Sequence, residues 1–256
     1  ELILKIWQRN NLSDYIDCVN SVDPKKVCIR ETNEEKIKSI VKDNNIDIKM
    51  VDIDKCFKEK DTKILQEKKN EILKNAEKLS KDLKKELTDS LNNYVNTNYG
   101  IKNEDSVAKL FETKYNRKII KDNFFRKRKL HDNWYVGGKV DGITDNNEII
   151  EIKNRMYKLF FKLRDYEKVQ IYMYMFINSI NKGYLVESLT KNHNKELNII
   201  EVDFEHEYFN KNIVENIEKF NNFYEEFLSN VNLKTLLLFG HEEKIDEFYY
   251  NYINKN

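Results

Sequence analysis

The chain has 256 residues, 40% of them hydrophobic and 12% aromatic, and its 45 Lys+Arg against 44 Asp+Glu leave a formal net charge of +1. This length and aromatic content indicate one large folded domain or two small ones, and they exclude a wholly disordered chain. No apolar run approaches the roughly 18 residues that a membrane-spanning helix needs, and three dispersed cysteines disfavour a disulfide framework, a zinc site and an iron–sulfur cluster. We therefore expect a soluble, intracellular protein with no membrane partner.

The near-zero net charge conceals an uneven distribution of charged residues. Residues 117–168 hold 14 Lys+Arg against 8 Asp+Glu, whereas residues 196–256 hold 5 against 13. The middle of the chain is therefore basic and the C-terminal region acidic. A polyanion would be attracted to the basic middle, with a salt-dependent affinity.

The first 95 residues read as an N-terminal extension. Short strand-like patterns occur at residues 27–30 and 46–51, with a helix expected at residues 34–41 between them. From residue 58 to 94, apolar residues recur at three- and four-residue spacing among Lys and Glu, which predicts one long amphipathic helix or two.

Residues 96–256 read as a second region with an α/β or α+β pattern. A mixed central sheet flanked by helices is the expected fold class. Three consecutive strands are expected, the first from the patterns at 118–120 and 124–128, the second at 134–143 and the third at 148–153, with a tight turn between the last two at residues 145–147, Asp-Asn-Asn. Two more strands are expected at 184–189 and 197–204, and helices at 103–115, 165–180, 207–229, 231–238 and 242–253.

The sharpest chemical feature is a pair of neighbouring strands that carry Asp141 and Glu151-Ile152-Lys153. Strand alternation places Glu151 and Lys153 on one face, with Ile152 on the other. If Asp141 points the same way, two carboxylates and one ammonium meet, a set that suits Mg²⁺ binding and the stabilisation of developing negative charge. The alternative is an exposed ladder of ion pairs without catalytic meaning.

Neighbouring residues favour the catalytic interpretation. Three of the six glycines lie within residues 137–142, which suggests close approach of a ligand or another backbone. Glu104 adds a carboxylate near the start of an expected helix, and Gln170 and Tyr174 lie one turn apart on another.

These motifs, in this order, resemble those of the PD-(D/E)XK nuclease superfamily, and more narrowly the YqaJ-like viral recombinases related to phage lambda exonuclease. The likeness covers about residues 98–205, although no proline precedes Asp141. The resemblance implies a restriction-endonuclease-like core.

The resemblance also implies roles for single residues. Lys153 would be the catalytic lysine, and metal would be bound by Asp141, Glu151 and the main-chain carbonyl of Ile152. Glu104 would serve a second metal or a water, and Gln170 would orient water or phosphate. The motifs are Gly100-x3-Glu104, Gly138-Lys139-Val140-Asp141-Gly142, Glu151-Ile152-Lys153 and Tyr166-Glu167-Lys168-Val169-Gln170-x3-Tyr174-Met175.

The resemblance also implies a function. It points to a DNA exonuclease that uses Mg²⁺, with Mn²⁺ as a substitute, at the ends of linear duplexes in viral or phage-type recombination or repair. Its setting would be the cytoplasm, the nucleus or a viral replication compartment, with a homo-oligomer and a single-strand annealing or replication protein as candidate partners. The alternatives are an endonuclease of the same superfamily, a catalytically silent DNA-binding scaffold, and a helical interaction protein built on residues 58–94.

Two basic segments are candidate contacts for DNA. Arg126 and Arg128 share one face of an expected strand and could bind phosphates, although a charged edge strand that resists aggregation explains them equally. Arg155 and Lys158 begin a basic loop that carries aromatic residues, and the resemblance places this loop at the DNA entrance. The alternative is that its phenylalanines are core anchors. Tyr174 completes the expected DNA contacts.

Overall fold

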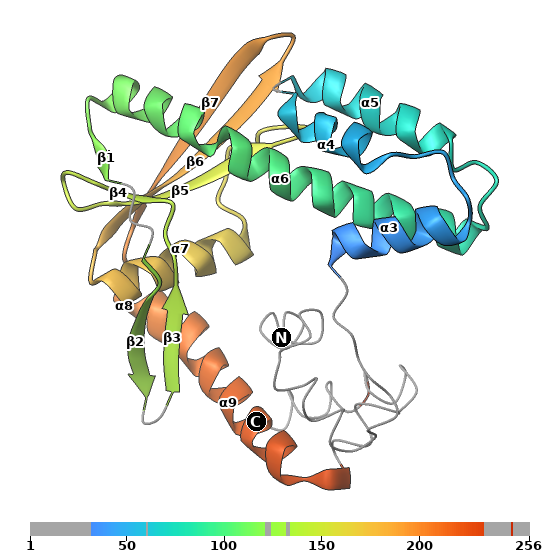
Figure 1. Cartoon of the computed structure of the whole chain (residues 1–256). Coiled ribbons are helices and arrows are strands. Elements are labelled where there is room, and N and C mark those ends of the chain that lie inside the picture. Colours follow the sequence, from blue (N-terminus) through green and yellow to red (C-terminus); the bar gives the residue numbers. More distant parts are fainter. Residues whose placement is uncertain (1–31, 60, 121–123, 132–133, 233–246, 248–256) are drawn as a thin grey trace. The chain divides into compact units, whose positions relative to one another are not determined.

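The computed structural model describes residues 32–59, 61–120, 124–131, 134–232 and 247 (Figure 1). The chain divides into two compact units, Glu31–Phe204, called here the first unit, and Glu205–Asn256 together with Glu1–Arg30, called the second unit, and each is described by itself. The strand expected at 27–30 lies outside the described residues, as do the positions expected to be helical from 233 onward, apart from residue 247.

The N-terminal part of the first unit is helical. Helix α3 (Asn33–Asp43) begins with a reciprocal cap, in which Thr32 and Glu35 each accept a hydrogen bond from the other's backbone N–H. Helices α4 (Met50–Lys58) and α5 (Thr62–Lys74) follow, the latter capped by Asp61. The strand expected at 46–51 is wrong, because helix α4 begins at Met50. The buried residues Ile53 and Cys56 fall at helical spacing after Met50, so the 3.6-residue period prevails over the short apolar run.

Helix α6 (Lys81–Tyr115) is 35 residues long. The long amphipathic pattern after residue 58 is therefore two helices, α5 and α6, and the helix expected at 103–115 is only the second half of α6. The expected boundary between the two regions, at 95/96, lies inside this continuous helix. Gly100 sits mid-helix with open space around its Cα, so the sequence signal for a new block is only a tolerated helical glycine.

The main sheet has five strands in the order β1-β4-β5-β6-β7. Strands β5 and β6 are parallel and are joined through helix α7 (Asp165–Asn178), while the other pairs are antiparallel. The mixed sheet flanked by helices confirms the expected fold class. Its strands are β1 (Ile119–Ile120), β4 (Gly142–Thr144), β5 (Ile149–Arg155), β6 (Lys182–Lys191) and β7 (Asn194–Asp203).

A separate two-stranded hairpin joins β2 (Arg126–His131) to β3 (Trp134–Gly138). The single strand expected at 134–143 is therefore wrong. Among the strands that the structure describes, β3 pairs with β2 alone, and the chain then passes through residues 139–141 before β4 enters the main sheet. Because β3 and β4 pair with different strands, the chain leaves extended pairing between them, and Asp141 lies in this connecting segment.

The two faces of the sheet are used differently. One face packs against the second half of α6, where Val107 and Phe111 meet Ile150 and Ile152 of β5. On the other face, the missing side chain of Gly183 allows Ile171 of α7 to approach β5. The first half of α6 belongs to another core, formed with α3, α4 and α5. Alternation along β5 therefore sends Glu151 and Lys153 toward α7, as expected.

The second unit begins with α8 (His206–Tyr208), a π-helical segment η1 (Phe209–Val214) and α9 (Glu215–Ser229). These segments follow one another directly and confirm the helix expected at 207–229. Among all helices in the described ranges, none is both long and apolar enough to cross a lipid bilayer.

Candidate active site on strand β5

The site begins where β4 stops pairing with β5. The ladder ends at the pair Gly142 and Ile150, and Asp141 then takes over as the partner of β5. Its Oδ2 accepts a hydrogen bond of 2.7 Å from the backbone N–H of Ile152. The N–H and C=O of one strand residue point to the same side, so the carbonyl of Ile152 also faces the strand edge that carries Asp141.

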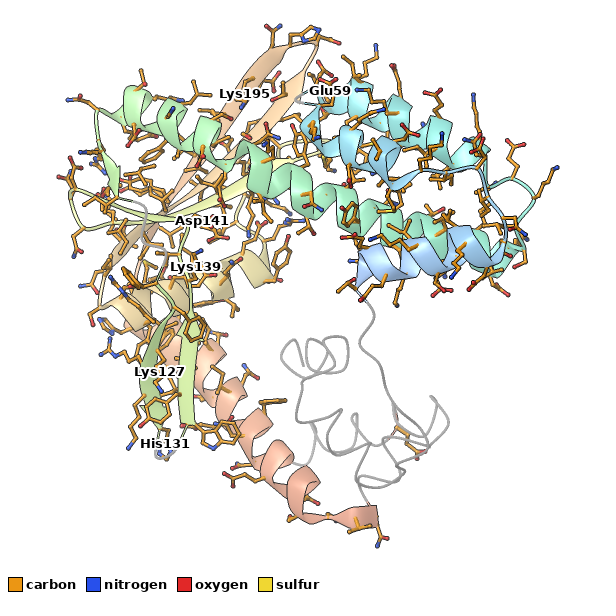
Figure 2. All side chains as sticks on the ribbon, in the orientation of Figure 1. Glu59, Lys127, His131, Lys139, Asp141 and Lys195 are labelled. Carbon is orange, nitrogen blue, oxygen red and sulfur yellow. The ribbon has the colours of Figure 1, made fainter. Side chains whose placement is uncertain are left out.

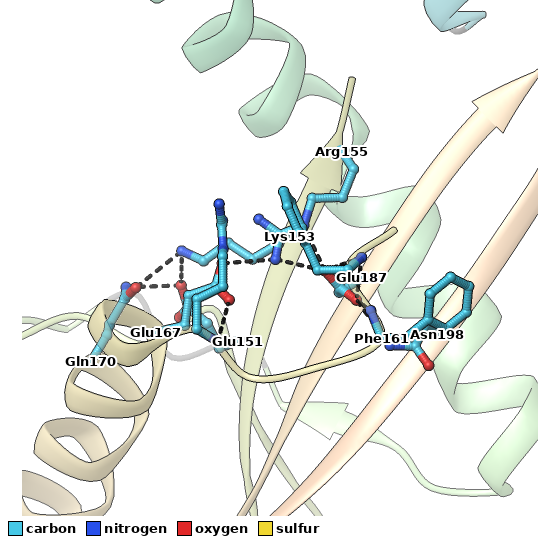
Figure 3. Close-up of polar contacts among 10 residues, drawn as sticks. Glu151, Lys153, Arg155, Phe161, Glu167, Gln170, Glu187 and Asn198 are labelled. Atoms are coloured by element: carbon cyan, nitrogen blue, oxygen red, sulfur yellow. Dashed lines mark hydrogen bonds and ion pairs between the residues drawn. The ribbon is translucent and has the colours of Figure 1, made fainter. Parts of the chain in front are cut away.

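Glu151, Lys153 and Gln170 form a closed triangle between β5 and α7 (Figure 3). Lys153 Nζ donates to Glu151 Oε1 at 2.6 Å and to Gln170 Oε1 at 3.0 Å, and Gln170 Nε2 donates to Glu151 Oε1 at 2.8 Å. The amide thus orients both charged groups, which a residue with only donors or only acceptors could not do.

One oxygen of Glu151 is left without a partner. The whole residue is only 3% exposed, and its Oε2 is buried and accepts no hydrogen bond from any of the residues that the structure describes. Burial and, after it, the nearby Asp141 carboxylate raise the pKa of Glu151 to about 7, against the opposing effect of the Lys153 ammonium. A buried carboxylate in this condition is stabilised by additional positive charge.

The ammonium of Lys153 is held in its charged form. Burial lowers the pKa of Lys153, but the Glu151 carboxylate outweighs it and the net shift is upward. Lys153 is therefore a cation and hydrogen-bond donor at neutral pH, suited to stabilising negative charge.

Tyr174 completes the α7 side of the site. Its hydroxyl accepts a hydrogen bond of 3.1 Å from Gln170 Nε2. A Cβ added to Gly138 would lie 2.6 Å from the Tyr174 ring, so this glycine lets the hairpin base approach the ring closely. Tyr174 is half-buried, which makes it a wall of the site as much as the DNA contact expected from sequence.

Glu104 lies on α6. Its charge makes a small contribution to raising the pKa of Glu151, and its service to a second metal or a water stays a prediction. The side chain of Asn154 fixes α6 here, because its Nδ2 donates to the Gly100 carbonyl at 2.8 Å and its Oδ1 accepts from Ser188 at 2.6 Å. Sequence reasoning missed Asn154, although it directly follows Lys153 and lies on the α6 face of β5.

Arg155 does not have the place expected for a DNA contact. It is 8% exposed, and its guanidinium forms ion pairs of 2.7 Å with both Glu167 and Glu187. Burial raises the pKa of Glu167, but hydrogen bonds from Arg164 and Arg155 outweigh it and leave a value of about 2. Arg155 is thus occupied by buried carboxylates, and the expectation that it binds phosphate is corrected.

The loop after β5 is anchored by the same cluster. Backbone N–H groups of Phe160 and Phe161 donate to Glu187, and the Phe160 ring lies under the guanidinium groups of Arg155 and Arg164. Phe160 is a partly buried anchor, while Phe161 is exposed and has a left-handed backbone. Lys158 is exposed, with its Nζ 5.5 Å from the centroid of the Phe160 ring, and its contact with phosphate stays a prediction.

Arg126 and Arg128 face α7 rather than solvent alone. Arg128 NH1 donates to the Phe176 carbonyl at 2.6 Å and to Ser179 Oγ at 2.9 Å, and Arg126 NH1 donates to Asn178 at 2.7 Å. A cation at a helix C-terminus is favoured by the helix dipole. Both arginines therefore secure the hairpin to α7, a structural role that neither sequence interpretation anticipated.

The donor set fits a hard cation with few protein ligands. Within the described ranges, no group of three or more His, Cys, Asp or Glu side chains is arranged to hold a metal. Mg²⁺ nevertheless commonly binds through one or two carboxylates together with waters and substrate phosphate. Asp141, the unpartnered oxygen of Glu151 and the Ile152 carbonyl satisfy that requirement, and oxygen donors also suit Mn²⁺.

Comparisons with known proteins give no functional assignment. No family model and no curated protein matches the chain. A solved structure described as "Crystal structure of SSO0001" is similar over 74% of this chain and 85% of that chain, at 15% sequence identity and a TM-score of 0.37. A likeness this low carries no argument about fold or activity.

Proposed function

We propose that this protein is a metal-dependent hydrolase of DNA phosphodiester bonds. The observation that carries the proposal is the buried, unpartnered Oε2 of Glu151, which lies beside a second carboxylate, Asp141, and an ammonium, Lys153. Most buried side-chain acceptors in folded proteins have a hydrogen-bond partner, so an unsatisfied carboxylate oxygen beside a second carboxylate calls for an explanation. The arrangement therefore supports a site prepared for a cation and an anionic substrate.

The residues take distinct roles in this reaction. Asp141, Glu151 and the Ile152 carbonyl would hold Mg²⁺ or Mn²⁺, with Glu104 nearby for a second ion or a water. Such an ion polarises a phosphate and lowers the pKa of bound water. The Lys153 ammonium stabilises the charge that develops on the phosphate, and Gln170 keeps Lys153 and Glu151 in register.

Exonuclease action at linear duplex ends is the form of the proposal that the motif resemblance favours. The basic stretch 117–168 surrounds the site in sequence and supports a polyanionic substrate. A role in viral or phage-type recombination or repair, with an annealing or replication partner and a homo-oligomer, rests on the resemblance alone. An endonuclease of the same superfamily is the second candidate, because the same residues serve either reaction.

Incubation with linear and circular duplex DNA, with Mg²⁺ or with chelator, tests the proposal. Degradation of the linear form alone is expected, and only in Mg²⁺. Cleavage of the circle would replace the exonuclease by the endonuclease. Inertness toward both would overturn hydrolysis and leave a binding scaffold.

Carboxylate variants assign any activity to this site. Asp141→Asn and Glu151→Gln should each reduce hydrolysis below detection while the circular dichroism spectrum stays unchanged, because each removes a charge that the cation needs. Asp145→Asn is the matched control, since Asp145 lies on the exposed turn between β4 and β5. Full activity in either site variant would overturn the assignment.

A further inference from the structure

The β2–β3 hairpin has one face committed to the protein. Paired residues on opposite strands share a face, and Arg126 and Arg128 pair with Gly138 and Val136. The two arginines bind the C-terminal end of α7, and Gly138 lies against Tyr174. This is the inner face of the hairpin.

Alternation sends the intervening residues to the opposite side. We define the outer face as Phe125, Lys127, Lys129 and Tyr135, together with the bare backbone of Gly137. Lys127 pairs with Gly137 and Lys129 pairs with Tyr135, so they share this side. Phe125 is 70% exposed and Tyr135 57% exposed, which is unusual for large aromatic rings.

The rings of the outer face are arranged rather than scattered. A Cβ added to Gly137 would lie 2.5 Å from the Phe125 ring, so the ring rests directly over glycine backbone. Lys127 Nζ lies 5.5 Å from the centroid of the Tyr135 ring. Aromatic and cationic groups therefore alternate along a surface about 13 Å long, the span of four strand residues.

We propose that this outer face binds single-stranded DNA, with unpaired bases stacked on Phe125 and Tyr135 and phosphates held by Lys127 and Lys129. Exposed aromatic rings combined with cations are the general means of binding single strands. The charge is complementary, because the two charged residues of the outer face, Lys127 and Lys129, are both cationic. Stacking requires bases that are not paired, which selects a single strand over a duplex.

The β2–β3 hairpin is joined by a short segment to Asp141 of the candidate active site. Only Lys139 and Val140 separate β3 from Asp141, and Figure 2 shows Lys127, Lys139 and Asp141 following one another from the hairpin toward the sheet. A strand on the outer face would thus lead to the candidate active site. This route rests on the proposed function, whereas the binding itself does not.

Fluorescence anisotropy with labelled single-stranded oligo(dT) tests the binding, using the full chain in chelator so that hydrolysis plays no part. Removal of each ring, by Phe125→Ala or Tyr135→Ala, should weaken binding at least about fivefold, since a stacked base contributes ~1–3 kcal/mol. Tyr135→Phe should keep the affinity, because stacking uses the ring and not the hydroxyl. Ile101→Ala, an exposed apolar residue on α6, is the control and should change nothing.

The lysines have a separate signature in the salt dependence. Lys127→Gln with Lys129→Gln should reduce the slope of log affinity against log salt by about 1.4, from ~0.7 per phosphate contact on a single strand. Lys109→Gln with Lys114→Gln removes the same charge from the exposed side of α6 and should leave the slope nearly unchanged.

Three results would overturn the inference: unchanged affinity in the ring variants, tighter binding of duplex than of single-stranded DNA, and tighter binding of single-stranded RNA. Failure of the single-strand binding proposal can be distinguished from failure of the proposed hydrolase. Binding by wild type and by Asp141→Asn, without cleavage in Mg²⁺, would leave the outer face intact and remove only the proposed hydrolase.

Discussion

Two halves of one strand face handle buried charge in opposite ways. Glu151, Lys153 and Arg155 alternate along the side of β5 that faces α7. At the first position, burial and a neighbouring carboxylate raise the pKa of Glu151 to about 7. At the last, two arginines overcome burial and lower the pKa of Glu167 to about 2. The same strand therefore carries one carboxylate that is paired with a single ammonium, Lys153, and contacts another that is paired with two guanidinium groups.

This difference in charge compensation distinguishes the candidate active site around Glu151 from the structural ion-pair cluster around Arg155. The Arg155 cluster contains its own compensating charges, and it fixes the loop after β5 through Glu187. The Glu151 site is one cation short, with a buried oxygen left unused. Under the proposed function, a bound cation and a phosphate would offset these unfavourable electrostatics, and strained charge of this kind is common at functional sites.

Removal of the two carboxylate charges should have unequal effects on stability. Glu167→Gln should lower the free energy of unfolding by up to about 3–5 kcal/mol, because it removes one of the two carboxylate partners of buried Arg155 and the carboxylate partner of Arg164. Glu151→Gln should change it by less than about 1 kcal/mol, or raise it, since a neutral amide replaces a carboxylate that burial disfavours. Urea unfolding followed by circular dichroism measures both.

A surface pair provides the control for that measurement. Glu201 forms an ion pair with Lys182 and is half exposed, so Glu201→Gln should cost less than about 1 kcal/mol. Equal losses for Glu151→Gln and Glu167→Gln would show that the two halves of the face do not differ.

The free energy of unfolding should depend on pH through the lowered pKa of Glu167. The folded pKa of Glu167 is about 2, below the ordinary 4.5, so its contribution to stability is complete above pH 4.5. That contribution is lost as the pH falls from 4.5 toward 2, where the folded protein must also accept the proton. The free energy of unfolding, measured by urea titration at several pH values, should decline less steeply in Glu167→Gln. An unchanged slope in that variant would contradict the assignment.

Among the variants that alter the candidate active site, the smallest loss of hydrolysis is expected for Gln170, whose amide bonds both Glu151 and Lys153. Gln170→Ala should lower DNA hydrolysis by about 10–100-fold, because groups that orient metal ligands usually contribute that much. Gln66→Ala, a half-buried glutamine on α5, is the matched control and should leave hydrolysis unchanged. If kcat is unaffected in Gln170→Ala, the triangle with Lys153 and Glu151 is only structural.

Periodicity predicted the parts of the fold that depend on local pattern. Strand alternation placed Glu151 and Lys153 on one face of β5, and helical spacing placed Gln170 and Tyr174 on one face of α7. The structure brings all four together through direct hydrogen bonds. These inferences needed only neighbours in sequence.

The misplaced residues depend on distant partners. Arg155 is buried because Glu187, on the adjacent parallel strand, accepts its Nε–H at 2.8 Å, and nothing near Arg155 in sequence announces that. Arg126 and Arg128 are likewise taken up by the end of α7, about 50 residues later. Such pairings arise from tertiary contacts, which override local propensity and charge patterns.

The continuity of α6 has a consequence for how the chain can change. Its buried residues up to Tyr99 face the helical core, and those from Val107 onward face the sheet, with Glu104 between the two sets. An α-helix turns about 100° per residue, so inserting a single residue near Gly100 would rotate one core-facing stripe away from the other. Insertions of seven residues, which nearly restore the angular phase, should be tolerated better than insertions of one or two. The two buried stripes of α6 must keep their angle relative to each other, so the length of this helix is constrained to changes of about a whole number of turns.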